Sequence, residues 1–153
     1  MTPAPQLFGL LSREHRDHLE ELTREVSFAE DFRIFSEHQP AGKFWVIHSG
    51  TVALDLGVPG SRRTTLETLG TGDLLGWSWM FPPKIWHFGA VAFSPVRAYE
   101  FGAMEVLAAC EEDPVFGLAC TRAIAQILAH RLDVARTKLL EEYEHHGAPD
   151  FGI

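Results

Sequence analysis

The segment from residue 72 to residue 88, called here the aromatic segment, holds the side chains best suited to bind a ligand. It contains Trp77, Trp79 and Trp86, three of the four tryptophans of the chain, together with Phe81 and Phe88. Faces of indole and phenyl rings can hold a flat apolar ligand or a cation. The same rings can instead fill a closed cavity, or form an exposed surface that docks a partner protein. The pattern leaves these three interpretations open.

Glycines punctuate the beginning of this segment. Gly70, Gly72 and Gly76 stand in the run from Leu69 to Gly76, which predicts a tight turn followed by a strand-to-helix turn. Because glycine lacks a Cβ, the backbone N–H groups of such turns can face a ligand. The glycines and the hydroxyl of Ser78 would supply the polar contacts of an otherwise apolar site.

Other residues that could take part in catalysis or bind a metal lack the spacing that either function needs. The adjacent pair His145–His146 lies near the C-terminal end, far from the other histidines in sequence, and offers no metal-ligand spacing. Cys110 and Cys120 lie ten residues apart in a region of helical pattern. On one helix they would be about 15 Å apart along the axis, too far for a disulfide. No nucleophile elbow, phosphate-binding lysine loop or Cys–His dyad spacing is present. We therefore expect neither an enzyme nor a metal site.

Composition narrows the class of protein further. The 153 residues, 46% of them hydrophobic, suffice for one domain with a sizeable core. A formal net charge of -8 disfavours direct binding to nucleic acid, which requires clustered cations. No apolar run reaches the roughly 18 residues of a membrane span, and the N-terminus does not read as a signal peptide. We expect a cytoplasmic protein without membrane association.

The chain divides into three zones within one domain over residues 1–144. Residues 5–25 are helical in pattern, with Ser12 as a candidate N-cap. Residues 26–101 hold short β-type runs broken by turn residues, a pattern typical of a sandwich or barrel. Residues 102–144 are helical again, and Asp113–Pro114 is the expected start of a last helix of about thirty residues. Residues 145–153 are expected to form a flexible tail.

The last predicted helix carries a heptad pattern, called here the a/d stripe. Its members recur at spacings of three and four residues: Ala125, Leu128, Leu132, Ala135 and Leu139. Ile124, Ile127 and Val134 form a second apolar face beside it. Two apolar faces suit a helix that packs on its own domain and also pairs with a second copy. We expect a homodimer, the alternative being a monomer in which one broad stripe packs on its own domain.

The order and spacing of these pieces resemble the cyclic-nucleotide-binding domain shared by catabolite-activator-type regulators, gated channels and kinase regulatory subunits. The resemblance covers roughly residues 8–140. It rests on the opening helices, on residues 26–35, on the strand pair at 44–52 (FWVIHSGTV), and on residues 69–76 (LGTGDLLG), which look like the start of the family's phosphate-binding cassette. It implies an α+β fold in which an eight-stranded antiparallel, jelly-roll-like β-roll is flanked by N-terminal helices and a long C-terminal helix.

Two departures from the family bear on the ligand. The resemblance implies a Glu after the cassette glycine, for the ribose hydroxyl, and an Arg about nine residues later, for the cyclic phosphate. Here Trp77 follows Gly76, and Trp86 stands at the Arg position to within about two residues. A buried phosphate without a paired cation is costly. We therefore expect no binding of cyclic AMP or cyclic GMP in the usual mode.

These observations predict a non-catalytic regulatory or sensor module without a DNA-binding domain, acting as a dimer on an unidentified protein partner. No cofactor is expected beyond a small-molecule ligand. One alternative is a ligand-free scaffold or docking protein that uses the aromatic segment, and a distant one is a cupin-like metalloenzyme. The expected ligand-binding residues are Gly72, Leu75, Gly76, Trp77, Ser78, Trp79, Trp86, His87 and Leu128.

Overall fold

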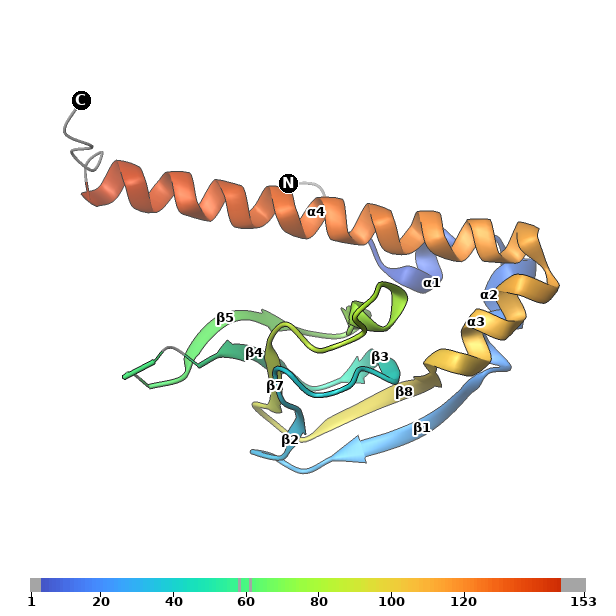
Figure 1. The fold of residues 1–153 in the computed structure, drawn as a ribbon, viewed down its shortest axis with the longest axis horizontal. Coiled ribbons are helices and arrows are strands. Elements are labelled where there is room, and N and C mark those ends of the chain that lie inside the picture. Colours follow the sequence, from blue (N-terminus) through green and yellow to red (C-terminus); the bar gives the residue numbers. More distant parts are fainter. Residues whose placement is uncertain (1–3, 58, 61, 147–153) are drawn as a thin grey trace.

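The computed structural model describes residues 4–57, 59–60 and 62–146. The helices are α1 (Leu7–Leu10), α2 (Arg13–Glu20), the 3-10 turn η1 (Ser78–Met80), α3 (Ala103–Glu112) and α4 (Pro114–His146). The strands are β1 (Thr23–Phe28), β2 (Arg33–Phe35), β3 (Lys43–Ser49), β4 (Val52–Leu56), β5 (Thr64–Leu69), β6 (Leu74–Leu75), β7 (Gly89–Ala92) and β8 (Val96–Gly102). Helices at both ends of the chain therefore enclose a continuous run of strands (Figure 1).

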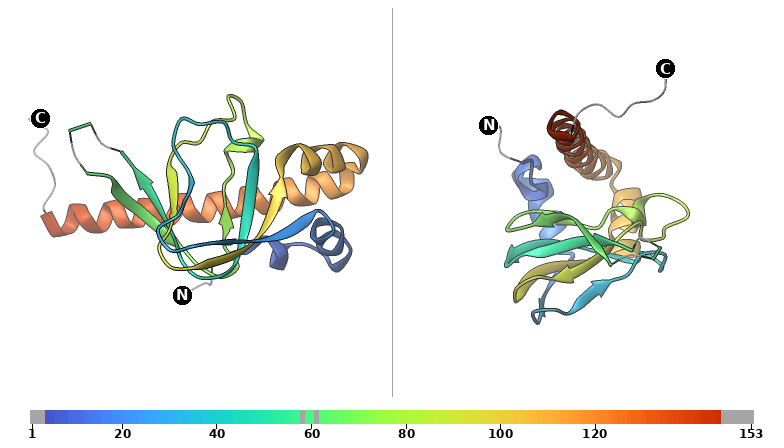
Figure 2. Two further views of the ribbon diagram at one scale, coloured as in Figure 1. Left: turned by 90° about the horizontal axis from the view of Figure 1, so that it is seen from below. Right: turned by 90° about the vertical axis from the view of Figure 1, so that its left-hand side faces the viewer.

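The strands form two antiparallel four-stranded sheets, with the orders β1-β8-β3-β6 and β2-β7-β4-β5. They face each other as a roll, over which α4 passes from one end to the other (Figures 1 and 2). This architecture confirms the predicted α+β fold with an eight-stranded antiparallel β-roll. No helix in the described part of the chain is both long enough and apolar enough to cross a membrane.

The boundary between the first helices and the roll lies earlier than expected. Ser12 caps α2 as predicted, since its hydroxyl accepts a hydrogen bond from the backbone N–H of His15 at 3.2 Å. However, β1 begins at Thr23, where the sequence analysis continued the helical zone to residue 25. Thr23 pairs with Phe101 of β8, so tertiary pairing decides the conformation of these residues.

A stack of aromatic rings fills part of the core of the roll. The ring of Phe44 lies between those of Trp79 and Phe101, at centroid distances of 4.4 Å and 4.5 Å. All three side chains are buried. Close stacking of this kind adds to the free energy gained by burying the rings. One tryptophan of the aromatic segment therefore belongs to the core.

Helix α4 divides into a packed half and an exposed half. The Oδ1 atom of Asp113 accepts a hydrogen bond from the N–H of Phe116 at 3.2 Å, so the predicted start of this helix is correct. Its first half contributes Phe116, Ile124 and Ile127 to the core. From Leu132 to residue 145 every side chain is exposed, although Figure 1 shows this half passing above strands β4 and β5.

The last helix also includes two residues of the expected tail. Residues 145 and 146 belong to α4, and the rest of the expected tail, residues 147–153, lies outside the described residues.

A buried carboxylate anchors the β4–β5 hairpin. Asp55 accepts hydrogen bonds from Arg33 at 2.7 Å and from Arg63 at 2.9 Å, and Arg63 also donates to Glu37 at 2.7 Å. Burial disfavours the charged form of Asp55, but the bonds from the two guanidinium groups outweigh it and lower the pKa of this carboxyl to about 2. Strand β2, which supplies Arg33, is thereby tied to the hairpin.

This network predicts a defined loss of stability in acid. The pKa of Asp55 is lower in the folded protein than the ordinary value of 3.8, so its stabilisation is complete above about pH 5 and disappears as the pH falls from about 4 toward 2. The shift corresponds to about 2 kcal/mol. Urea unfolding followed between pH 7 and pH 2 should show this loss in the wild type and not in Asp55→Asn.

The matched control is Asp133→Asn, which changes an exposed aspartate on α4. Its stability curve should run parallel to that of the wild type. If Asp55→Asn also runs parallel to the wild type, the ion network does not stabilise the fold.

Candidate functional site

The turn before the aromatic segment is built by backbone hydrogen bonds. The N–H of Gly70 donates to Asp73 Oδ2 at 2.8 Å, and the N–H of Gly72 donates to the carbonyl of Ile47 at 2.7 Å. Gly72 has a φ of 86°, a conformation that favours glycine. The atoms nearest to a Cβ on Gly72 would be those at the end of the Gln6 side chain. This glycine therefore shapes the turn into β6, and its immediate neighbour is the N-terminal segment.

Gly76 fulfils a different requirement, because a buried indole lies directly over it. Its φ is 95°, and an added Cβ would come within 2.8 Å of Trp86 Cη2. The ring of Trp86 stacks on that of Phe35 at 3.9 Å and is 4% exposed. Trp86, expected in the ligand pocket, thus packs in the core, and it fills the space that the missing Cβ of Gly76 leaves.

Trp79 and Leu75 also point into the core. Trp79 is fully buried, and its indole N–H donates to the carbonyl of Gly76 at 3.2 Å. Leu75 lies on β6, where it pairs with Trp45 of β3. These expected ligand residues instead support the backbone of the segment from below.

Trp77 and His87 form a ring pair on the outer side of the segment. Their rings stack at a centroid distance of 5.2 Å. Ser78 is buried, and its hydroxyl lies 3.1 Å from Nδ1 of His87, which holds the imidazole in place. His87, which follows Trp86 in the chain, therefore faces Trp77, the residue after Gly76. The structure places the imidazole of His87, and not the indole of Trp86, opposite Trp77.

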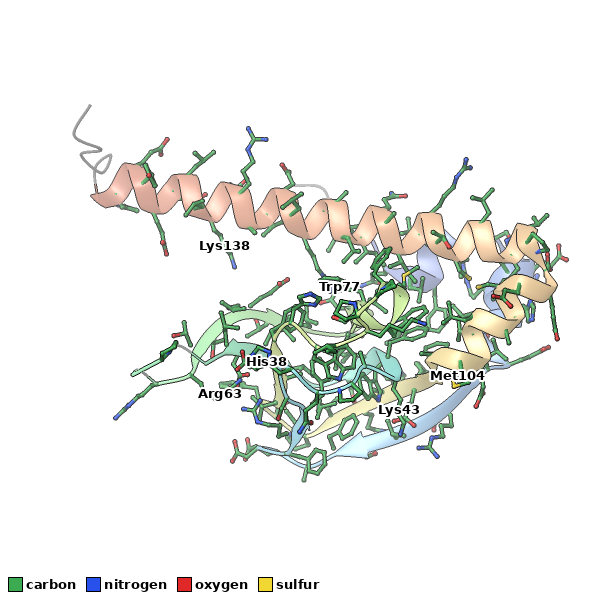
Figure 3. All side chains as sticks on the ribbon, in the orientation of Figure 1. His38, Lys43, Arg63, Trp77, Met104 and Lys138 are labelled. Carbon is green, nitrogen blue, oxygen red and sulfur yellow. The ribbon has the colours of Figure 1, made fainter. Side chains whose placement is uncertain are left out.

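A cavity of about 360 Å³ lies between α4 and the roll, and is called here the α4 cavity. Figure 3 shows Trp77 on the roll side of this gap, facing the helix. The cavity is lined by Leu54, Glu67, Trp77, Phe88, Leu128, Arg131 and Leu132. Of the expected ligand residues, Trp77 and Leu128 line it. Its size and its largely apolar wall are those of a small-molecule site.

Arg131 is the residue that the sequence analysis missed. Its guanidinium donates a hydrogen bond to the backbone carbonyl of Leu74 on β6. Burial lowers the pKa of Arg131, while the charges of Glu67 and Asp73 act in the opposite direction. The sequence signal that could have identified Arg131 is its position near Leu128 and Leu132 of the a/d stripe, between the two apolar faces of the helix.

The rest of the a/d stripe is exposed. Leu132 is 72% exposed and Leu139 is 59% exposed, and Ala125 and Ala135 are exposed as well. Only Leu128 packs partly against the core. Ile124 and Ile127 of the second apolar face are buried, whereas Val134 is exposed. Most of the stripe therefore has no intramolecular partner within the described residues.

Residues suited to metal binding or catalysis are dispersed in the described part of the chain. Among residues 4–57, 59–60 and 62–146, no three His, Cys, Asp or Glu side chains are arranged to hold a metal ion. His48 is exposed and lies 3.3 Å from the hydroxyl of Tyr99, and exposed His38 contacts Glu37. His48 and His38 thus have separate local environments.

The contrast between Gly72 and Gly76 yields a testable difference. Alanine at either position incurs the cost of a positive φ, about 1–2 kcal/mol. At Gly76 the added methyl group also collides with the buried Trp86 ring, which costs about 1–3 kcal/mol more. Urea unfolding should show that Gly76→Ala is less stable than Gly72→Ala by this second amount. Equal losses would mean that the Trp86 ring does not depend on the absent Cβ.

Comparisons with known proteins agree with this geometry. The chain matches the cyclic nucleotide-binding domain family over residues 25–113, which is more than half of its length. No curated protein matches it. Among solved structures, it resembles the N-terminal domain of a transcriptional regulator from Streptomyces coelicolor, at 26% identity over 84% of this chain and 90% of that chain, with a TM-score of 0.70.

Two further structures share the architecture. The catabolite activator protein of Thermus thermophilus is 25% identical over 90% of this chain and 63% of that chain, with a TM-score of 0.73. A cyclic nucleotide-binding domain from Methylobacillus flagellatus is 18% identical over 86% of this chain and 74% of that one, with a TM-score of 0.79, and shows the fold alone. The relatives named in these comparisons are regulators and binding domains. The chain belongs to the cyclic nucleotide-binding domain family.

Proposed function

We propose that the chain is a non-catalytic sensor module whose small-molecule ligand occupies the α4 cavity. The observation that carries this proposal is that Trp77 of the aromatic segment and Leu128 of α4 line the same cavity. A ligand held there would contact the roll and the helix together. Occupancy would then favour one position of the helix over another, which is the physical requirement for a signal.

The chemistry of the wall argues against cyclic AMP and cyclic GMP. Trp77 stands where the family resemblance implies a ribose-binding Glu, and its ring stacks on His87. The opposite wall, on α4, supplies the guanidinium of Arg131, and β5 on the roll side supplies the carboxylate of Glu67. A flat aromatic anion fits this arrangement better, because its rings can pack on Trp77 while its charge pairs with Arg131.

The fluorescent aromatic sulfonate 1-anilinonaphthalene-8-sulfonate is a direct probe of this site. We expect saturable binding of about one molecule per chain, weakened at least about tenfold in Arg131→Met, since a hydrogen bond to a charged group contributes about 1.5–3 kcal/mol. The exposed Arg122 on the same helix provides the control variant Arg122→Met, which should bind like the wild type. Cyclic AMP and cyclic GMP should not displace the probe.

Either of two results would contradict this assignment. Displacement of the probe by a cyclic nucleotide would identify a nucleotide sensor that uses other anchors. Absence of saturable binding would favour a ligand-free scaffold, an alternative that the burial of Trp79 and Trp86 in the core supports.

We further propose that the module is a homodimer through α4 and passes its state to a protein partner. Support comes from the a/d stripe, whose exposed leucines stand on the second half of α4, where every described side chain is exposed. Coiled-coil pairing of two such helices would bury Leu132 and Leu139.

This arrangement predicts the oligomeric state of two variants. Glutamates at both positions, in Leu132→Glu with Leu139→Glu, would bury charge in the helix pair and should convert the dimer to a monomer. Leu140→Glu changes an equally accessible leucine outside the stripe and should leave the dimer intact. Light scattering coupled to size exclusion measures the mass. A wild-type monomer, or a double variant that stays dimeric, would contradict the proposed interface.

A further inference from the structure

The corner between α3 and α4 brings together two helix segments that are close in sequence and run in different directions. Helix α3 ends at Glu112, and α4 begins at Pro114. Figure 1 shows the chain turning at this corner, so that α3 lies against the first turns of α4. Gly117 of α4 lies against Cys110 of α3: a Cβ there would lie 3.0 Å from Cys110 Cβ and 2.7 Å from its carbonyl oxygen.

This approach overturns the expectation that Cys110 and Cys120 are far apart. They lie on different helices, so the separation of about 15 Å along one axis does not apply. Cys120 follows Gly117 by three residues, and positions three apart on a helix share a face, with Cβ atoms about 5–6 Å apart. The face of α4 that Cys110 touches is therefore the face that carries Cys120. Both cysteines are free thiols.

The two thiols interact and differ in accessibility. Burial raises the pKa of both groups, that of Cys120 to about 12, and each thiol also perturbs the other. Cys120 is buried, whereas Cys110 is partly accessible. Raised pKa values keep the thiolate fraction small, so reaction is slow. A disulfide is strongly oxidising when its reduced form is stabilised as a thiolate. The raised pKa values remove that stabilisation from the reduced Cys110–Cys120 pair.

We propose that Cys110 and Cys120 form a reversible intramolecular disulfide when the protein meets a small-molecule disulfide such as oxidised glutathione. The Cys110 thiolate attacks one sulfur of that disulfide, which forms a mixed disulfide and releases one thiol. The Cys120 thiolate then attacks the Cys110 sulfur and releases the second thiol. Two protein sulfurs are oxidised, the small disulfide is reduced, and the two protein protons pass through solvent to the released thiols.

The bond would connect the end of α3 to the base of α4. Cys120 lies two turns before Leu128, the first residue of α4 that lines the α4 cavity. Oxidation would therefore fix the angle at which α4 leaves the corner. The inference itself rests on the packing at Gly117 and is independent of the ligand proposed for the cavity.

The test compares the folded chain with the same chain unfolded in urea. Each is equilibrated in mixtures of reduced and oxidised glutathione, quenched in acid, alkylated under denaturing conditions and weighed by mass spectrometry. The expected product has lost two hydrogens and takes up no alkylating reagent. At a fixed concentration of reduced glutathione, the folded chain should be half oxidised at a concentration of oxidised glutathione at least about tenfold lower than the unfolded chain requires, because packing holds the thiols together.

Single variants provide the matched controls. Cys120→Ser should stop at the mixed disulfide on Cys110, and Cys110→Ser should react far more slowly, because its remaining thiol is buried. The inference is overturned if the folded chain is no easier to oxidise than the unfolded chain. It is also overturned if the folded wild type accumulates glutathione on Cys110 while Cys120 stays reduced. Both criteria use the wild-type chain, so they hold even if a variant fails to fold.

Discussion

The packing of Trp86 over Gly76 determines what the aromatic segment can present to a ligand. The indole stacks on Phe35 and occupies the space that any side chain at residue 76 would need. Trp79 supports the same stretch from the other side through its hydrogen bond to the Gly76 carbonyl. Because the rings of Trp86 and Trp79 are buried in the core, Trp77 and His87 remain on the outer side of the segment. The two buried indoles thus act as supports, and the available binding surface is narrower than the composition of the segment suggests.

The short strands and the helix starts were predictable because their signals are local, whereas the eight-stranded β-roll was implied by the family resemblance. Short runs with turn residues between them, an N-cap at Ser12 and a helix start at Asp113 each follow from a few neighbouring residues. The directions of the three indoles were not predictable in this way. Trp77, Trp79 and Trp86 have the same side chain and similar neighbours, and only the position of Phe35 and Phe44 on other strands decides which of them is buried.

The two cysteines show how a break between helices changes the distance expected between residues on either side of it. The helix start at Asp113–Pro114 was recognised from the sequence, yet the separation of Cys110 and Cys120 was measured as if one helix carried both. A break between them reverses that conclusion, because the chain turns there and Gly117 admits the backbone of α3. Arg131 was missed for a related reason: its partner is a backbone carbonyl on β6, and backbone carbonyls carry no sequence signal.

The charges around the α4 cavity suggest how a ligand there would act on the helix. Arg131 belongs to α4 but donates its hydrogen bond to β6, so it already connects helix and roll. An anionic group in the cavity would compete with Leu74 for the same guanidinium, and Glu67 on the roll would repel that group toward the helix. Ligand binding would thereby exchange a contact between helix and roll for one between helix and ligand. In a site whose roll-side wall offers Trp77 in place of a charged anchor, this exchange at Arg131 would couple occupancy to the position of α4.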